Sequence, residues 1–328
     1  MYWSKHNLCR ILAAIGFLIL IFDSRLVLEG VQSGIDLCVK TVIPSLFPFF
    51  VLSTVLLSLQ ETNLCYPVQL LIKTLKIPNS AASVLVPAFF GGYPVGAKCV
   101  GDLYHKKQIS RDEANRLLSF CSNAGPSFLF GIISGFFPDR KMIWMLWMIH
   151  VISAVITAMI IPAKKTERFV PQDNKYISEK SILFPAVRAM CIVCCWVALF
   201  RGIINFMNNW FCWRMPVWIQ VCFMGILELT NGCCQLFLIE DIRLRFIVCS
   251  CLLAFGGICV LLQTASVTDG LSLACYIKGK IIQTIFSFLI SCTIVLEKSI
   301  IFAGFLPILI MFLRKIENRY RNPQTIPV

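Results

Sequence analysis

The sequence is poor in charge. Only 14% of its 328 residues are Asp, Glu, Lys or Arg, whereas 58% are hydrophobic, and the mean hydropathy is +0.78. A soluble domain needs a larger charged share than this, so a soluble fold is excluded. Long polar blocks are also missing, because apolar stretches of spanning length recur from Leu8 to Leu313. The sequence predicts one all-α polytopic domain embedded in a lipid bilayer.

Catalytic and metal-binding sets are absent as well. The three histidines, His6, His105 and His150, lie far apart, and no nucleophile, base and carboxylate share a recognisable spacing. The 17 cysteines lie mostly in apolar stretches, where thiols behave as small hydrophobic groups. Cys191 and Cys194 have CxxC spacing but no second pair beside them. We therefore expect no enzyme activity, no metal and no cofactor.

Acidic residues are scarce beside basic ones, 17 against 30, which gives a net charge of +13. In a membrane protein such an excess indicates topology rather than nucleic-acid binding. It predicts cytoplasmic N- and C-termini, a cytoplasmic loop at 163–181 and a basic cytoplasmic tail. The first apolar stretch, 8–22, is predicted to be a retained helix, because Asp23, Ser24 and Arg25 follow it in place of a cleavage site; a cleaved signal peptide is the alternative.

Two apolar segments carry a break at their middle and do not suit a simple span. Segment 81–103 has basic residues beyond both ends and Gly91, Gly92, Tyr93 and Pro94 at its centre. Both of its ends then lie on one side of the membrane, which predicts a re-entrant helical hairpin. Segment 217–239 is predicted to be a second hairpin from the other side. The alternative makes both segments true spans and places the 164–180 loop outside.

The order of segments repeats. Residues 35–162 contain a span (35–59), a hairpin, a broken span (114–137) and a span (142–161); residues 182–296 contain a span (182–207), a hairpin, a broken span (246–263) and a span (281–296). The chain enters the two series from opposite sides of the membrane, which predicts an inverted repeat. An N-terminal helix and connector (1–34) precede the repeat, and a C-terminal helix and tail (297–328) follow it. Inverted repeats with paired breaks place a substrate site near the bilayer midplane. The alternative is that Gly and Pro only pack or kink the helices.

Two charged residues within the broken segments are candidates for a substrate site. Lys98 is costly in an apolar stretch unless it is paired or faces water, so it is a candidate to meet an anionic substrate; snorkelling to the cytoplasmic face is the alternative. Glu228 has apolar neighbours that disfavour its charged form, so it could bind a proton during transport, or else form a structural ion pair. The predicted substrate-binding residues are Gly91, Gly92, Tyr93, Pro94, Lys98, Asn123, Gly125, Ser127, Glu228, Thr230, Asn231, Gly256, Gly257 and Gln263.

Five motifs together resemble the YlbJ-type sporulation integral membrane proteins, within the wider Gate or nucleoside-recognition family. They are IPSLFPF at 43–49, GYPVGAK at 92–98, NAGP at 123–126, LELT at 227–230, and FGG at 255–257 with Gln263. The resemblance implies a relative of concentrative nucleoside transporters that moves dipicolinate, a flat dianion, across the outer forespore membrane. Nucleoside transport and a non-transporting sporulation scaffold are the alternatives, and a homo-oligomer remains open.

Overall fold

The computed structural model describes residues 10, 14, 16, 17, 21–58, 66–163, 180–210 and 214–296. These residues form helices and connecting turns and contain no β-strand. Five of the described helices are long and apolar enough to cross a membrane, which confirms a helical polytopic membrane protein. The predicted helices at 8–22 and 300–313 and the basic loop at 164–180 lie wholly or largely outside the described residues. The five candidate spans are Ser24–Leu57, Arg140–Ile160, Leu183–Trp210, Ile242–Val267 and Leu273–Leu296.

The first half of the chain begins with a helix that is longer than predicted. It starts at Ser24 rather than residue 35, so residues 24–34 are helical and not a connector. The elements are α2 (Ser24–Leu37), a π-helical turn η1 (Cys38–Val42), α3 (Ile43–Ser58), α4 (Tyr66–Leu75), a 3₁₀ turn η2 (Asn79–Val84), α5 (Leu85–Phe90), α6 (Val95–His105), α7 (Arg111–Leu118), α8 (Pro126–Gly131), a 3₁₀ turn η3 (Ile133–Phe136) and α9 (Arg140–Ile160).

The second half contains a similar series, with a helix break in each of the two predicted places, at Glu228 and at Gly256. One boundary was wrong. The last span was predicted to begin at residue 281, which left Lys278 and Lys280 in a loop before it, whereas the last helix already begins at Leu273. The elements are α10 (Lys180–Trp210), α11 (Val217–Leu227), α12 (Leu229–Cys234), a 3₁₀ turn η5 (Leu236–Leu238), α13 (Ile242–Phe255), α14 (Gly257–Val267) and α15 (Leu273–Leu296).

The segment predicted as a broken span at 114–137 is interrupted more deeply than expected. Helix α7 is polar, opens with a capping box between Ser110 and Glu113, and ends at Leu118. The chain then runs without helix to Gly125, where Pro126 begins the six-residue α8. Neither helix is long enough to cross a membrane, and the segment is not among the five candidate spans. The 119–125 link therefore brings non-helical backbone into the middle of the protein.

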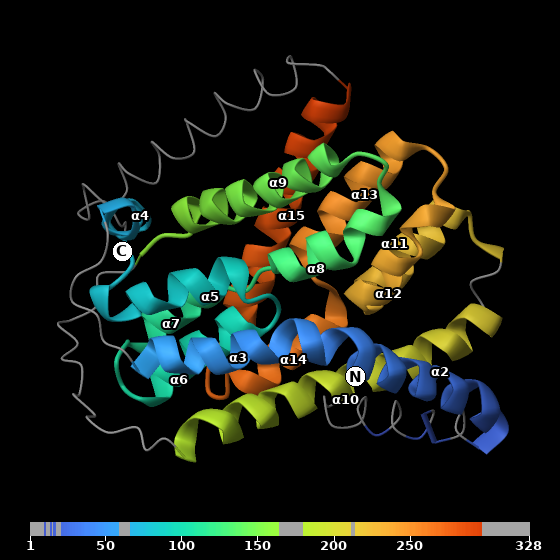
Figure 1. The fold of residues 1–328 in the computed structure, drawn as a ribbon, viewed down its shortest axis with the longest axis horizontal. Coiled ribbons are helices and arrows are strands. Elements are labelled where there is room, and N and C mark those ends of the chain that lie inside the picture. Colours follow the sequence, from blue (N-terminus) through green and yellow to red (C-terminus); the bar gives the residue numbers. More distant parts are fainter. Residues whose placement is uncertain are drawn as a thin grey trace, which may run out of the picture.

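The long helices form two packed groups with the short helices between them (Figure 1). Helix α10 lies along α2 and α3, whereas α15 packs against α9 and α13. Helices α5 and α6 pack on each other, and so do α11 and α12, so each pair is a helix–turn–helix unit. Whether these units enter and leave a membrane on one side, and whether the two halves are inverted, stay predictions.

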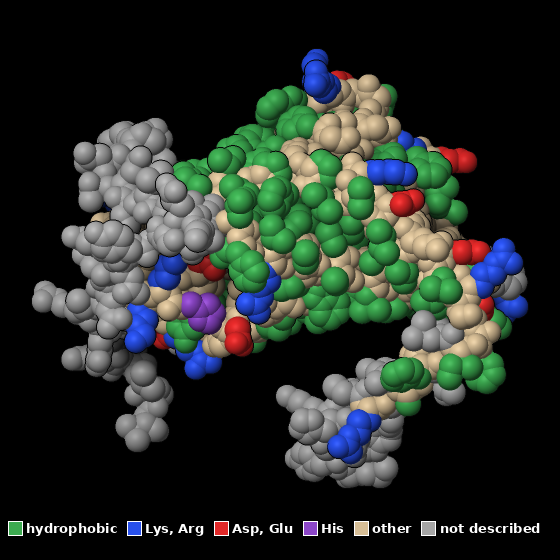
Figure 2. Space-filling model, turned by 60° about the horizontal axis from the view of Figure 1, so that its bottom comes forward, with side chains coloured by type: hydrophobic (Ala, Val, Ile, Leu, Met, Phe, Trp, Pro, Cys, Tyr) green, Lys and Arg blue, Asp and Glu red, His purple; other side chains and the backbone are tan. Residues whose placement is uncertain are grey.

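The surface carries a broad apolar area. Figure 2 shows hydrophobic side chains covering the middle of one face, with most of the Lys, Arg, Asp and Glu side chains toward its edges. Large apolar residues are widely exposed on the long helices, including Trp144 on α9, Phe184 on α10 and Phe288 on α15. Exposed apolar area of this extent is unfavourable in water but suits contact with lipid chains.

Candidate functional site

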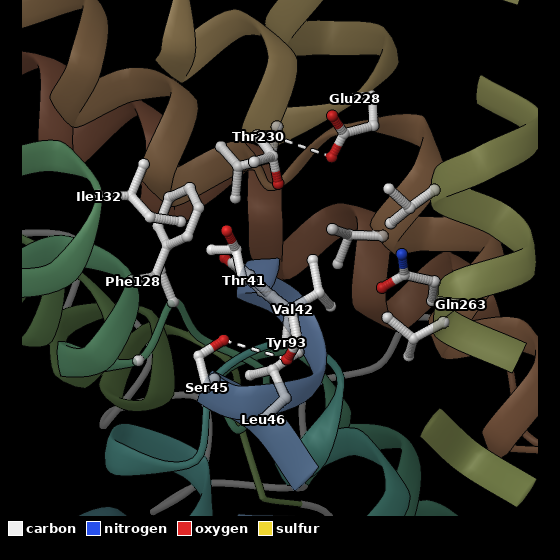
Figure 3. Close-up of a pocket in the computed structure, with 17 residues that line it drawn as sticks. Thr41, Val42, Ser45, Leu46, Tyr93, Phe128, Ile132, Glu228, Thr230 and Gln263 are labelled. Carbon is white, nitrogen blue, oxygen red and sulfur yellow. Dashed lines mark hydrogen bonds between the residues drawn. The ribbon is translucent and has the colours of Figure 1, made fainter. Parts of the chain in front are cut away.

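A small cavity of about 60 Å³ lies where the interrupted segments meet (Figure 3). The α5–α6 turn, the 119–125 link, the α11–α12 break and α14 all contribute to its wall, together with the π-helical turn between α2 and α3. Six of the predicted substrate-binding residues line it, and they come from both halves of the chain: Gly92, Tyr93, Gly125, Glu228, Thr230 and Gln263. Breaks that are far apart in the sequence therefore contribute to one cavity, as expected, but its wall is mostly apolar rather than polar.

The α5–α6 turn, residues 91–94, which we call the first tip, rests directly on the 119–125 link. A Cβ atom on Gly125 would lie 2.9 Å from the backbone nitrogen of Gly92 and 3.0 Å from the carbonyl oxygen of Phe90. Only glycine allows the two backbones to come this close. Gly92 also has a φ of +82°, which a residue with a side chain rarely adopts. Gly91 and Pro94 complete the turn without lining the cavity.

The α11–α12 break, residues 227–229, which we call the second tip, is held by its own carboxylate. Glu228 is 2% exposed, and its two oxygens accept hydrogen bonds from the backbone N–H groups of Thr230, at 2.9 Å, and Asn231, at 2.7 Å. The side chain thereby satisfies donors that the start of α12 leaves without helical partners. Figure 3 shows Glu228 and Thr230 together on one side of the cavity.

The α13–α14 break connects the two tips. Gly256 has a φ of +81°, and a Cβ there would lie 3.2 Å from the Tyr93 ring. The Tyr93 hydroxyl donates a hydrogen bond to the carbonyl oxygen of Leu253, one turn before the break, at 3.0 Å. Gly257 packs against the end of α11, because its Cβ position lies 2.9 Å from the carbonyl oxygen of Gly225. Movement at this break would therefore change the contacts of both tips.

Lys280 anchors the first tip from behind. Its ammonium group is 1% exposed and donates hydrogen bonds to the Tyr93 hydroxyl at 3.0 Å, to Gln283 Oε1 at 2.7 Å and to the carbonyl oxygen of Ser122. All three acceptors are neutral. A buried cation is costly unless its N–H groups are satisfied, and three acceptors use its full donor capacity. The site therefore contains a buried lysine beside the first tip, which the sequence analysis missed.

A polar network extends from Lys280 to α9. The Gln283 amide donates to Asn123 Oδ1 at 3.0 Å, and Asn123 in turn donates to the carbonyl oxygens of Ala88 and Phe120. His150 Nε2 accepts from the backbone N–H of Ala124 at 3.0 Å. Asn123 was predicted to bind substrate, but these bonds place it behind the cavity, where it holds the 119–125 link in position.

Lys98 does not reach the cavity. Its side chain is buried within α6 and forms an ion pair with Asp102, one helical turn further on, at 2.6 Å. Ser127, at the start of α8, also lies outside the cavity wall, and its hydroxyl has no hydrogen-bond partner among the described residues. Asn231 follows the second tip but faces Arg201 of α10, whose guanidinium donates to its Oδ1 at 2.6 Å.

Periodic polar residues could have revealed Lys280. Polar side chains recur every three or four residues along α15, at Tyr276, Lys280, Gln283, Ser287 and Ser291, and all five are buried. That spacing is a helical stripe, and in a membrane protein a polar stripe faces the protein interior. Placing Lys280 in a loop hid this pattern.

Two wall residues were not predicted to bind substrate: Thr41, and Ser45, which lies in the IPSLFPF motif. They lie at the π-helical turn η1 and just after it, and π turns are frequent at functional sites. No group of three or more His, Cys, Asp or Glu residues within the described ranges is placed to hold a metal ion.

These features define a helical integral membrane protein with a small cavity where both tips, the 119–125 link and α14 meet. The chain is 31% identical over 168 residues to the sporulation integral membrane protein YlbJ of Bacillus subtilis, which confirms the resemblance to YlbJ-type proteins. The match covers 49% of this chain and 39% of that relative. No protein-family model and no solved structure matches the chain. Placement in the wider Gate or nucleoside-recognition family stays a prediction.

Proposed function

We propose that this chain is a membrane transporter, and that the cavity between the two tips is its substrate site. The observation that carries this proposal is that both tips, the 119–125 link and α14, which follows the α13–α14 break, all line one cavity. Non-helical backbone in a membrane is tolerated where it is buried in protein or lines a polar cavity, and transporters use it for substrate binding. The two helix–turn–helix units are then re-entrant hairpins of an inverted repeat, and access alternates as one half rocks against the other.

The proposed substrate is a small organic anion, with dipicolinate as the first candidate. Three observations support it. The motif resemblance implies dipicolinate, the similar Bacillus subtilis protein is named for sporulation, and a basic side chain lies beside each tip. Lys280 donates to Tyr93 at the first tip, and Arg201 donates to Asn231 beside the second. The proposed location is the outer forespore membrane, with both termini in the cytoplasm.

Uptake into liposomes tests this proposal. The purified full chain, reconstituted at known density, should take up radiolabelled dipicolinate faster than protein-free vesicles. Glu228→Ala removes the carboxylate that holds the second tip, so uptake should fall by about tenfold or more. Glu240→Ala is the matched control, because Glu240 is exposed just beyond the same unit. No uptake by the wild-type chain, together with loss of sporulation on deleting the gene, would favour the scaffold alternative.

One observation favours a second candidate, an uncharged solute such as a nucleoside. Glu228 is the one charged side chain in the wall of the cavity, and the other polar groups there are hydroxyls, a carboxamide and backbone. Such groups suit hydrogen bonds to a neutral ligand. Competition distinguishes the two substrates: excess uridine or adenosine should leave dipicolinate uptake unchanged if the anion is the substrate, and direct uptake of the nucleoside would support the second candidate.

A further inference from the structure

A second cavity, of about 250 Å³, lies on the other side of α12 between that helix, α2 and α10. It is more polar than the first. Its wall includes Glu29 and Ser33 of α2, Arg201 of α10, and Asn231 and Gln235 of α12. Because Asn231 directly follows Thr230, which lines the first cavity, the first turn of α12 separates the two cavities.

Three buried polar atoms around this cavity have no hydrogen-bond partner among the described residues: Arg201 Nε, Asn231 Nδ2 and Gln235 Oε1. Buried polar atoms in proteins are seldom left unpaired, and each such atom indicates a missing partner. Here three of them come from two helices and gather at one polar cavity. Two are donors, and turning the Gln235 amide by half a rotation would make it a third donor.

The neighbouring polar groups are already occupied. Asn205 donates to the carbonyl oxygen of Leu26 at 2.7 Å, and Asn208 accepts from Gln220 at 3.3 Å. Glu29, the other charged group in the wall, is half exposed and accepts from Arg25 at 2.9 Å. These side chains therefore do not neutralise Arg201.

The charge of Arg201 is permanent, because a guanidinium does not lose its proton in a protein. Asn231 Oδ1 is a neutral acceptor, so its 2.6 Å hydrogen bond fixes the guanidinium without cancelling the charge. Glu228, beyond the first turn of α12, accepts two backbone hydrogen bonds and makes no salt bridge with Arg201 among the described contacts, although the two charges attract each other at longer range. Two of the three groups left without partners are donors, and they lie beside the positive charge of Arg201, which is an arrangement that can bind a carboxylate.

We propose that Arg201 and Asn231 form a carboxylate-binding subsite, in which an organic anion is held beside the second tip before or after it occupies the first cavity. This inference rests on the proposed transport function. The subsite supplies the cation that the first cavity lacks. Arg201 on α10 then takes the role of binding the anionic substrate, which the sequence analysis gave to Lys98. A carboxylate there accepts from Arg201 Nε and from Asn231 Nδ2.

Asn231→Asp is the sharpest test. The new carboxylate still accepts the hydrogen bond from Arg201, so the helix contact is kept, but the Nδ2 donor is replaced by a negative charge. Binding of dipicolinate to the purified full chain in detergent, measured by the concentration that half-maximally raises the melting temperature, should weaken by about ten- to hundred-fold. Arg201→Gln should weaken it to a similar degree.

Arg188→Gln is the matched control, since Arg188 lies on the same helix but is exposed. The proposal predicts unchanged binding for this variant, and no binding of the uncharged pyridine-2,6-dicarboxamide by any variant. Equal dipicolinate affinity in wild type, Asn231→Asp and Arg201→Gln would overturn the subsite, even if wild-type liposomes transport dipicolinate. Absence of uptake by wild type would instead overturn the transport function, whatever the binding experiment shows.

Discussion

The two tips end similar helix–turn–helix units but are stabilised in different ways. The first tip contains no charged residue and is held by groups from elsewhere in the sequence: Gly125 packs on its backbone, and Lys280 reaches Tyr93 from α15. The second tip is stabilised locally, because Glu228 accepts hydrogen bonds from two backbone N–H groups in the first turn of α12. One tip depends on tertiary contacts, and the other depends on a local cap.

This difference has a mechanical meaning for the proposed transport. A tip held from another helix moves when that helix moves, whereas a tip with a local cap can move as a unit and keep its own hydrogen bonds. Tyr93 also contacts the α13–α14 break, so a movement in the second half of the chain would shift the first tip. We therefore expect damage to the first tip to spread further than damage to the second.

The largest effect is expected where the first tip meets the 119–125 link. Gly125→Ala places a methyl group 2.9 Å from a backbone nitrogen, which neither segment can avoid without shifting. We expect a loss of about 3 kcal/mol in the free energy of unfolding. The destabilised variant should then give a low yield of monodisperse protein on size-exclusion chromatography. Gly135→Ala is the control, since nothing lies within 4 Å of its Cβ position. Equal yields of the two variants would contradict the close contact.

Glu228→Gln tests the local cap of the second tip. A carboxamide offers one acceptor oxygen in place of two, so one backbone N–H of α12 loses its partner. We expect a loss of about 2 kcal/mol in unfolding free energy, measured by chemical denaturation in detergent. Glu240→Gln, at an exposed position, should leave stability unchanged. If the two variants are equally stable, the carboxylate is not what holds this tip.

A double-mutant cycle tests whether the first tip is anchored from α15. Tyr93→Phe and Lys280→Met each remove one end of the 3.0 Å hydrogen bond. The two changes should be non-additive by about 1 kcal/mol in melting experiments. Tyr93→Phe combined with Lys278→Met should be additive, because Lys278 is exposed on the same helix. Additive behaviour in both cycles would remove Lys280 as the anchor.

The smallest effect is expected at Lys98. Replacing the whole ion pair by Lys98→Met with Asp102→Leu removes both charges together, so unfolding free energy should change by less than about 1 kcal/mol. The KM for dipicolinate uptake should also stay within about twofold, because Lys98 lies away from both cavities. A KM raised tenfold or more would return Lys98 to the substrate site.

The break positions were the most predictable part of the fold. Gly91–Gly92 with Pro94, and Gly256 with Gly257, interrupt apolar stretches with residues whose backbone preferences are strong and local. The depth of the interruption at 119–125 was less predictable, because residues 119–124 contain neither Gly nor Pro and are held out of the helix by contacts with α5, α9 and α15.

Part of the site was predictable because some of its residues have strong local backbone preferences or stand out in their own segment. Gly92, Gly125 and Glu228 lie at the breaks, so local sequence marked them. The roles of the cations were not predictable in this way. Lys98, Arg201 and Lys280 are all single basic residues near apolar residues. Lys98 has an acidic partner at helical spacing, Asp102, but no local signal says that Arg201 faces a polar cavity or that Lys280 anchors a tip.

By itself, the sequence determined that this protein is a helical membrane protein and that its helices are interrupted at particular residues. Hydropathy and backbone preference are properties of short segments, so both can be read from the sequence. Tertiary structure alone decided which interruptions share a cavity and which buried charge faces which partner. Those outcomes depend on contacts such as the one between Tyr93 and Lys280, which lie far apart in the chain. The polar stripe of α15 indicates that Lys280 faces the interior, but not which residue it meets.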